Sequence, residues 1–320
     1  MKKVKLLSVV IVLFSVAFFV GCSDDDDEVK KNETGQLSVK LTDAPSDDAN
    51  VQGTFVTVSD VKVDGESVEG FTKQTIEVSA YQQGDAKLLI SDDVEAKSYN
   101  SLTLVLDYES DASGDLPGSY VLTEDGKKHD LAAESQAQSE ITFQKNFDVE
   151  SNGQTSLVVD FDLRKAVTRD TESSTESDYK FVTSAEMQNA LRIVKEDNSG
   201  EVQGDVSSTV NTDDDEHYVF IYKKGEFNSS AETQGQGSSN VLFANAATSA
   251  KVESDGSYKL SFLEEGDYEI HLAAYEKSNN RFDFNALLEA NSTISGLLLN
   301  DISVSSQTSV EVDISIVGLL

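Results

Sequence analysis

The chain has 320 residues, of which 38% are apolar and 26% are charged, a balance typical of a globular protein rather than a disordered one. Its formal net charge of −33 gives a surface that repels phosphate backbones, which argues against nucleic-acid binding. The length is sufficient for two domains that each bury a core, and a single cysteine excludes an internal disulfide. Apolar burial must therefore supply the stability.

Residues 1–21 are typical of a secretory signal peptide. Three lysines near the N-terminus precede the uncharged apolar run Leu6–Val20. This run is shorter than the roughly 20 apolar residues that a membrane span needs, but it suits a cleaved signal.

Gly21 lies directly before Cys22, and this pair resembles the lipobox of bacterial lipoproteins, although Phe19 stands where that family usually has leucine. The resemblance implies that the Cys22 thiol is acylated and becomes the mature N-terminus, which anchors the protein to a membrane. Several acyl chains on one residue anchor stably, because each buried CH₂ contributes about 0.8 kcal/mol. The alternative is an ordinary signal peptide that ends near a cysteine.

An acidic block, Asp24–Glu28, follows at once, and residues 22–34 are interpreted as a solvated tether. The block also resembles the export signal after the lipid-bearing cysteine in surface lipoproteins of the Bacteroidetes type. That resemblance implies an outer-membrane protein that faces the cell exterior.

Residues 35–197 are predicted to form the first β-domain. Leu37, Val39 and Leu41 alternate with polar residues, which indicates a half-buried strand. Further strands are predicted at Phe55–Val63 (with a β-bulge between Val58 and Val61), Thr75–Val78, Lys87–Ile90, Ser101–Tyr108, Tyr120–Leu122, Ile141–Phe147, Thr155–Phe161 and Tyr179–Val182. Short helices are predicted only near Ala132–Ala137 and Ser184–Leu191. Many short strands with Gly- and Ser-rich turns predict an all-β sandwich or barrel.

Several stretches of this region resemble the DUF4382 family of bacterial exported domains. The most specific is Leu41-Thr42-Asp43-Ala44-Pro45, and Tyr99–Leu106, Val159–Asp162 and Arg192–Val194 match later landmarks. Ser98 stands where the family usually has glycine. Because the activity of that family is unknown, the resemblance implies an architecture without a mechanism.

The same resemblance singles out three carboxylates. Asp43 is expected to cap its own turn, and Asp160 and Asp162 are expected to point outward from an alternating strand. A calcium site is the alternative, but no stretch has the spacing of a calcium-binding loop. No metal site is therefore predicted.

Residues 198–320 are predicted to form a second β-sandwich domain. In the strand His217–Tyr222, three aromatic residues alternate with Val219 and Ile221. The turns before Tyr258 and Tyr268 resemble those of carboxypeptidase-regulatory-like domains, which have a prealbumin-like sandwich. Other predicted strands are Gly200–Val206, Ser257–Leu260, Glu269–Tyr275, Ile302–Val304 and Val310–Ile316. Because that fold superfamily includes starch-binding modules, the resemblance implies glycan binding as one alternative.

The sequence contains no catalytic motif, so no catalytic residue, cofactor or enzymatic activity is predicted. The histidines His129, His217 and His271 lack metal-ligand spacing, although His217 and His271 could meet across a sheet. A pair of glycosidase-type carboxylates cannot be located among 58 acidic residues. Tryptophan is absent, so any sugar-stacking platform must use tyrosines; the candidates are Tyr218, Tyr222, Tyr268 and Tyr275.

Together these patterns predict a non-enzymatic, lipid-anchored surface protein of two β-sandwich domains. The expected role is binding or adhesion, with a protein or glycan ligand and with the membrane as a partner through Cys22. The alternatives are a carbohydrate-binding protein that uses the second domain, a structural subunit of an envelope assembly and, last, an enzyme.

Overall fold

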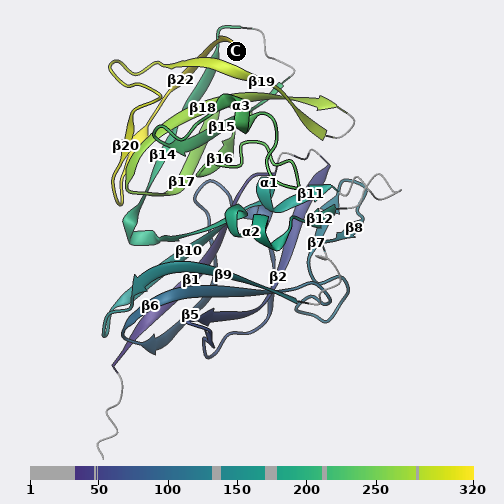
Figure 1. Cartoon of the computed structure of the whole chain (residues 1–320), viewed down its shortest axis with the longest axis vertical. Helices are drawn as coiled ribbons and strands as arrows, with labels where there is room; N and C mark the ends of the chain where they lie inside the picture. Colours follow the sequence, from purple (N-terminus) through teal and green to yellow (C-terminus); the bar gives the residue numbers. More distant parts are fainter. Residues whose placement is uncertain are drawn as a thin grey trace, which may run out of the picture. The chain divides into compact units, whose positions relative to one another are not determined.

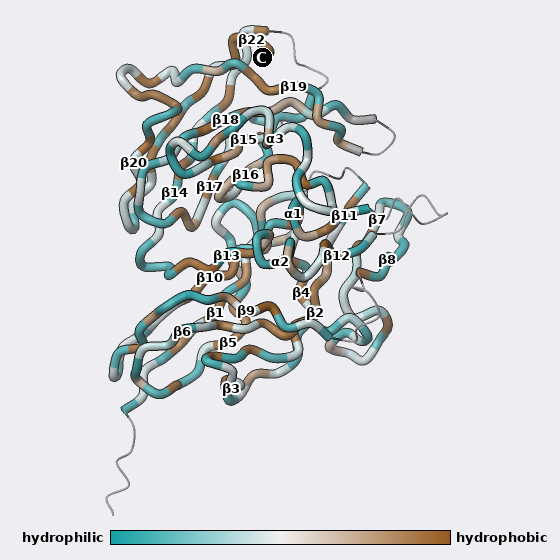
Figure 2. The backbone as a smooth tube through the Cα atoms, in the orientation of Figure 1, coloured by the Kyte–Doolittle hydropathy of each residue, from teal (hydrophilic) through white to brown (hydrophobic). Residues whose placement is uncertain are grey.

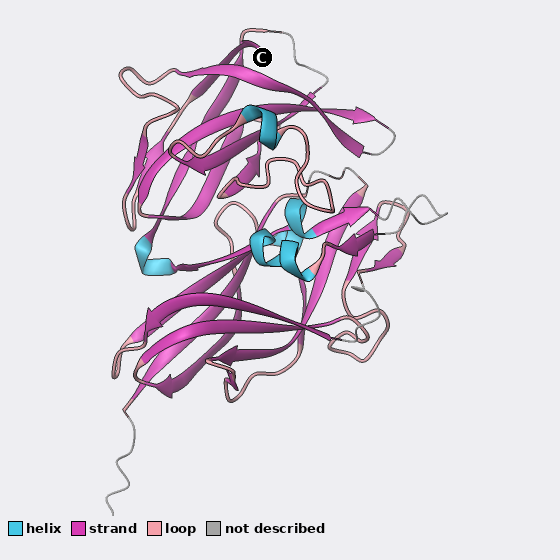
Figure 3. Cartoon of the chain, viewed as in Figure 1, coloured by secondary structure: helices cyan, strands magenta, loops and turns pink. Residues whose placement is uncertain are grey.

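The computed structural model describes residues 33–46, 48, 50–131, 138–169, 179–210, 215–278 and 281–320. Within it, Glu33–Leu320 is one compact unit. The prediction of an all-β protein is confirmed, because strands dominate and the helices are short (Figure 3). The signal peptide, Cys22, the acidic block and the helix predicted at Ala132–Ala137 lie outside the described residues.

The strands fall into two regions that share no sheet (Figure 1). The first region, residues 34–195, contains β1 (Thr34–Ala44), β2 (Val51–Val63), β3 (Glu66–Ser67), β4 (Gln74–Glu77), η1 (Val78–Ala80), β5 (Lys87–Glu95), β6 (Ser98–Asp107), β7 (Tyr120–Thr123), β8 (Lys128–Asp130), β9 (Gln138–Asp148), β10 (Gln154–Asp162), α1 (Leu163–Ala166), β11 (Val167–Arg169), β12 (Tyr179–Phe181), α2 (Ser184–Ala190) and β13 (Leu191–Lys195). The second region, residues 199–319, follows the short helix η2 (Glu196–Asn198).

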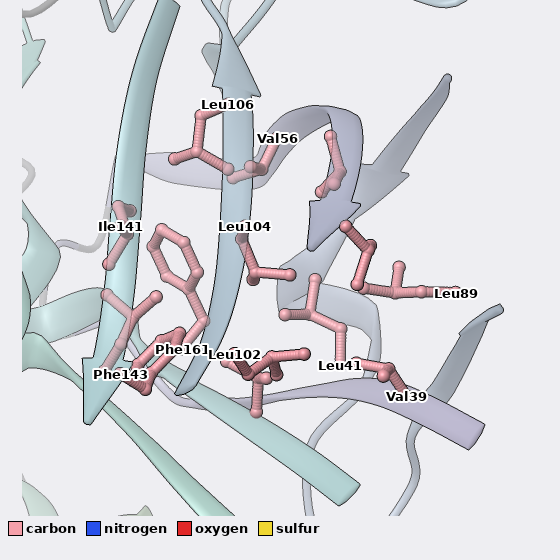
Figure 4. Packing of buried hydrophobic residues seen from close by; sticks show 14 of the residues in the cluster. Val39, Leu41, Val56, Leu89, Leu102, Leu104, Leu106, Ile141, Phe143 and Phe161 are labelled. Carbon is pink, nitrogen blue, oxygen red and sulfur yellow. The ribbon is translucent and has the colours of Figure 1, made fainter. Parts of the chain in front are cut away.

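Two sheets of the first region pack face to face around one hydrophobic core. The four-stranded sheet has the order β13-β10-β1-β5, with β1 and β10 parallel, and the larger sheet runs β8-β7-β2-β6-β9. Figure 4 shows Val39 and Leu41 of β1 and Phe161 of β10 among leucines of β6, and all of these side chains belong to one buried cluster. Alternating apolar residues thus produce a sandwich core, as predicted.

Local irregularities in the first region also follow the sequence. The register of β2 against β6 shifts between Val58 and Asp60, which confirms the predicted β-bulge. Asp64 and Gly65 have φ angles of 48° and 85°, so the turn between β2 and β3 uses the left-handed conformation that glycine favours. The predicted helix near Ser184–Leu191 is present as α2.

The second region is one folded sheet of nine strands. It contains β14 (Ser199–Ser208), β15 (Asp215–Lys223), α3 (Ser229–Glu232), β16 (Thr248–Lys251), β17 (Ser257–Glu264), β18 (Gly266–Ser278), β19 (Arg281–Ser292), β20 (Ile302–Val304), β21 (Ser309–Glu311) and β22 (Ile314–Leu319). Its main path is β16-β15-β18-β19-β22-β14-β17. Because β14 pairs with β17 and β21 along one part and with β22 along another, the sheet folds over its own core.

The two faces of β15 serve different cores, as the alternation predicted. Val219 and Ile221 belong to a mainly aliphatic cluster inside the folded sheet. Tyr218, Phe220 and Tyr222 belong to an aromatic cluster on the other face, which residues from the segment 227–246 cover. Hydrophobic stretches lie mainly on the strands, and the connecting turns are more hydrophilic (Figure 2).

Two details of the second region differ from the sequence prediction. Strand β19 was not predicted, because the alternation of apolar and polar residues along it is interrupted. The interruption coincides with a shift in its pairing register with β18, between Ala274 and Tyr275. The run Val310–Ile316 was predicted as one strand, but it is divided into β21 and β22, which pair with different parts of β14. Within the described ranges, no helix is long and apolar enough to cross a membrane.

Candidate functional site

The outer face of the four-stranded sheet is polar and yet buried. Asp160 and Asp162 are two residues apart on β10, so they lie on the face opposite the core residue Phe161. They do point away from the core, as predicted, but their relative exposures are only 3% and 4%. The prediction that they face solvent is therefore wrong. The second region covers them, which alternation within one strand could not reveal.

Each of these aspartates is paired with cations of the first region. One oxygen of Asp160 accepts hydrogen bonds from Arg192, whose Nη2 lies 2.7 Å away, and from the Thr248 hydroxyl at 3.2 Å. One oxygen of Asp162 lies 3.2 Å from both Arg164 Nη2 and Lys165 Nζ. Buried charges are stable only when paired in this way.

The same three cations also bind backbone oxygens of the second region. Arg164 donates to the carbonyls of Leu242 and Phe243, Lys165 donates to Ala246 O, and Arg192 donates to the carbonyls of Ser261 and Phe262. The Lys165 bond is 2.6 Å long. We call this set of two aspartates, three cations and five carbonyls the carbonyl joint. Charge-assisted bonds of this kind are about twice as strong as neutral ones, so the joint fixes the two regions to each other.

Asp43 lies on the opposite side of the sheet, because it pairs with the core residue Phe161 across β1 and β10. Its carboxylate accepts hydrogen bonds from Gln82 Nε2 at 2.9 Å and from the Leu163 amide at 3.3 Å. The prediction that Asp43 caps its own turn is therefore wrong, since its backbone partner is the first residue of α1. Burial raises the pKa of Asp43 well above its ordinary value, and the nearby charges of Asp160 and Asp162 add to this effect.

Two cavities adjoin the carbonyl joint. The larger, about 190 Å³, lies between the α2–β13 junction and residues 244–247, and Asp160, Asp162, Lys165 and Arg192 help to line it. The smaller, about 20 Å³, is lined by Ser249 and Ser261, whose hydroxyl oxygens have no partner among the described residues. A cavity of that size holds about one water.

Glu186 makes a second connection between the regions. It forms a capping box with Thr183 at the start of α2, and its two carboxylate oxygens accept from the amide and the hydroxyl of Ser239, each at 2.9 Å. Burial alone would raise the pKa of Glu186, but these hydrogen bonds outweigh it and lower the pKa to about 2.

The four tyrosines considered for sugar stacking are fully buried. Tyr218, Tyr222, Tyr268 and Tyr275 have relative exposures of 0–1%. The Tyr222 hydroxyl donates to the buried Glu232 at 3.0 Å. The prediction that these tyrosines could form a binding platform is therefore wrong, because they pack in the cores of the second region.

The histidines do not form a metal centre. His217 pairs with Ala274 and His271 pairs with Phe220, so the two rings do not meet across the sheet. His271 instead stacks on Phe227 with ring centroids 3.6 Å apart. Across the described residues, no group of three or more His, Cys, Asp or Glu side chains is placed to hold a metal ion.

Sequence reasoning missed the residues that matter most at this site. Arg164, Lys165 and Glu186 were not singled out, and Arg192 entered only as part of a family landmark. One signal was present, because the run from Asp160 to Lys165 places two acids and two bases at the end of a buried strand. Such a run indicates internal ion pairing, but the carbonyl partners carry no sequence signal.

Comparison with known proteins identifies the class of the first region. Residues 34–182 match the family described as domain of unknown function (DUF4382). The resemblance read from the sequence is confirmed for this part. The sheet of the first region extends past the match, because β13 pairs with β10.

Among solved structures, the chain is similar to a leucine-rich repeat protein from Bacteroides thetaiotaomicron, with 12% identity and a TM-score of 0.22. That alignment covers 88% of this chain and 26% of that protein. Two others are the minor pilin GBS52 of Streptococcus agalactiae (10% identity, 89% and 97% covered, TM-score 0.21) and the major pilin subunit of Bacillus cereus (11%, 89% and 71%, TM-score 0.21). These low scores carry no functional conclusion. No curated protein matches the chain.

Proposed function

We propose that this protein is a non-enzymatic, lipid-anchored protein of the outer cell surface, which acts in binding or adhesion. The observation that carries the proposal is the use of the buried charged groups. Asp160, Asp162, Arg164, Lys165 and Arg192 all bind each other or backbone carbonyls. Charges arranged in this way hold two β-regions together, which is a structural use of buried charge.

The location is supported by the sequence alone. Cys22 follows a signal-like apolar run, and the acidic block after it resembles a surface-export signal. The fixed joint between the regions suits a role in which a rigid unit is presented on an acidic tether. In this view the second region is a prealbumin-like sandwich. This assignment is supported by the core positions of Tyr258 and Tyr268, with exposures of 2% and 1%.

Protease treatment of intact cells tests the proposed location. The protein should be degraded while a periplasmic marker stays intact, and the Cys22→Ser variant should leave the membrane fraction. Protection from protease in cells with an intact outer membrane would contradict surface display. Membrane association of cleaved Cys22→Ser would contradict the lipid anchor.

A hydrolase panel and an array of glycans and host-surface proteins test the proposed role. The purified full chain should release no product from any hydrolase substrate and should bind a restricted set of array members. Turnover that depends on Asp160 or Asp162 would overturn the non-enzymatic assignment.

A further inference from the structure

The larger cavity at the carbonyl joint has an apolar wall of small residues. Ala190, Ala244, Ala246 and Ala247 line it, and because alanine side chains stop at Cβ, they leave a volume of about 190 Å³. A single water needs only about 10–15 Å³, so the cavity has room for one small organic molecule. No aromatic side chain is among the described residues that line it.

Two buried acceptor oxygens at this cavity have no partner. Asp160 and Asp162 both line the cavity, with relative exposures of 3% and 4%. The cations of the joint and the Thr248 hydroxyl all bind the Oδ2 atoms of these aspartates. The other oxygen of each aspartate, Oδ1, accepts no hydrogen bond from any described residue. Because a buried acceptor without a donor is unfavourable, the cavity favours a molecule that donates hydrogen bonds.

The charges around the cavity balance. Asn245, which lines the cavity, donates its backbone amide and its side-chain amide to the buried Glu232. Asp43, on the core side of the sheet, is held toward its neutral form because burial raises its pKa. Three cations therefore meet three charged carboxylates: Arg164, Lys165 and Arg192 against Asp160, Asp162 and Glu232. Since an added charge would have no counter-charge here, an uncharged ligand fits the cavity best.

Hydrogen-bond donors lie beside the two acceptor oxygens. Lys165 has three ammonium protons, and its described partners, Ala246 O and Asp162, use two of them. Asn189 lines the cavity from α2, where it is exposed and carries a side-chain amide. A hydroxyl group donates one hydrogen bond and accepts up to two, so it matches donors and acceptors that lie side by side.

We propose that this cavity binds an uncharged polyhydroxy compound of monosaccharide size, whose hydroxyl groups donate to Asp160 Oδ1 and Asp162 Oδ1. The two aspartates are two residues apart on one face of β10, about 7 Å along the strand, so one compact molecule reaches both. The hydroxyl oxygens accept from Lys165 and Asn189. A carboxylate would bring acceptors where donors are needed, and an ammonium compound would lie beside three cations.

The inference gives a ligand chemistry to the proposed binding role and rests on that role for its biological meaning. The two can fail separately. On the array of glycans and surface proteins, binding that persists when Ala244→Leu fills the cavity would keep the binding role and overturn the polyol site.

Titration of the ¹⁵N-labelled full chain, purified in detergent, tests the proposal by NMR. The probes are glucose, galactose, mannose, myo-inositol, glucuronate and methylammonium. At least one neutral probe should shift the amide signals of Arg192 and Ala246, with a dissociation constant near 1 mM, because no aromatic ring lines the cavity. Glucuronate should bind at least tenfold more weakly than glucose or not at all. Tighter binding of glucuronate or methylammonium, or no binding of any neutral probe, would overturn the proposal.

A crystal soaked in the neutral probe that binds should show hydroxyl oxygens within hydrogen-bond distance of both Oδ1 atoms. Water alone in the cavity would overturn the proposal.

Three variants separate binding from folding. Ala244→Leu fills the cavity without changing any charge and should weaken binding of the neutral probe at least tenfold. Asn189→Ala alters an exposed position that folding does not require, and it should weaken binding about threefold. Gln188→Ala is the matched control, because Gln188 is also exposed on α2 but does not line the cavity, and it should bind as the wild type does. Unchanged binding by Ala244→Leu and Asn189→Ala would place the ligand elsewhere and overturn the proposal.

Discussion

The first region contributes charged side chains to the carbonyl joint, whereas the second region contributes mainly backbone oxygens. Arg164, Lys165 and Arg192 extend from β13 and from α1 at the end of β10. Their acceptors in the second region are main-chain carbonyls between residues 242 and 262. A side-chain donor fixes the residue type at its position, but a carbonyl acceptor fixes only the path of the backbone. The carbonyl joint therefore constrains the residue types of the first region, but it constrains only the backbone path of the second region.

The cores differ in a related way. The first region has one core between two sheets, in which aromatic side chains such as Tyr99, Phe143 and Phe161 are mixed with aliphatic ones. The second region separates the two kinds of side chain: a mainly aliphatic core lies inside its folded sheet, and an aromatic cluster lies on the other face, where Phe243 stacks on Phe220 with centroids 4.1 Å apart. The aromatic cluster holds the segment whose carbonyls meet Arg164. Packing in the second region thus positions the acceptors that the first region needs.

The largest expected effect comes from removing a cation of the joint. Arg164→Met should lower the free energy of unfolding by about 3–5 kcal/mol, because Asp162 loses a buried partner and two carbonyls lose their donor. Urea denaturation at pH 7 measures the change. Lys62→Met, which breaks an ion pair with the exposed Glu140, is the control and should change little. Equal effects of the two variants would show that the joint contributes no special stability.

The contribution of the aromatic cluster in the second region is tested at Phe243. This residue is fully buried, and Phe243→Ala should cost about 3 kcal/mol through the cavity that it leaves. The same denaturation experiment measures it. If Arg164→Met and Phe243→Ala act through one unit, the double variant should lose less than the sum of the two single losses. Strict additivity would contradict the view that this packing positions the carbonyl acceptors.

Asp43→Asn tests the buried carboxyl on the core side of the sheet. Because the pKa of Asp43 is raised in the folded state, the folded protein binds more protons than the unfolded chain above about pH 3.9, and stability falls as the pH rises. The variant should be at least as stable as the wild type at pH 8. Its stability should also depend less on pH between about 4 and 8. A loss of stability at pH 8 would mean that the Asp43 carboxylate is needed in its charged form.

The smallest effect is expected at Glu186. Its pKa is lowered from 4.5 to about 2, so its contribution is present above pH 4.5 and is lost as the pH falls toward 2. Glu186→Gln should remove this part of the acid dependence. The group is largely solvent-screened, so the change at pH 7 should be below about 1 kcal/mol. Thermal unfolding between pH 2 and pH 7 measures it, and unchanged acid sensitivity would contradict the assignment.

The sequence predicted much of the fold because strand alternation is a local property. Leu37, Val39 and Leu41 defined the buried face of β1, and the broken alternation after Val58 located the β-bulge. The sequence failed at β19, where a register shift in the partner strand disturbs the pattern. It also failed to separate β21 from β22, because both parts of Val310–Ile316 are apolar enough to read as one strand.

By itself, the sequence determined the β-class, the DUF4382 resemblance and the faces of β15, since these depend on residue type and spacing along one strand. Only the tertiary structure decided which polar groups are buried and which partners they bind. Asp160 and Asp162 lie on the outer face of their sheet, but the second region covers that face and turns expected surface carboxylates into buried ion pairs. The tyrosines considered for sugar binding are also buried by tertiary packing, within the clusters of the second region. The burial of a residue depends on which segment packs against it, and that segment can be far away in the sequence. Every residue has a backbone carbonyl, so the sequence does not indicate which carbonyls accept hydrogen bonds from the joint.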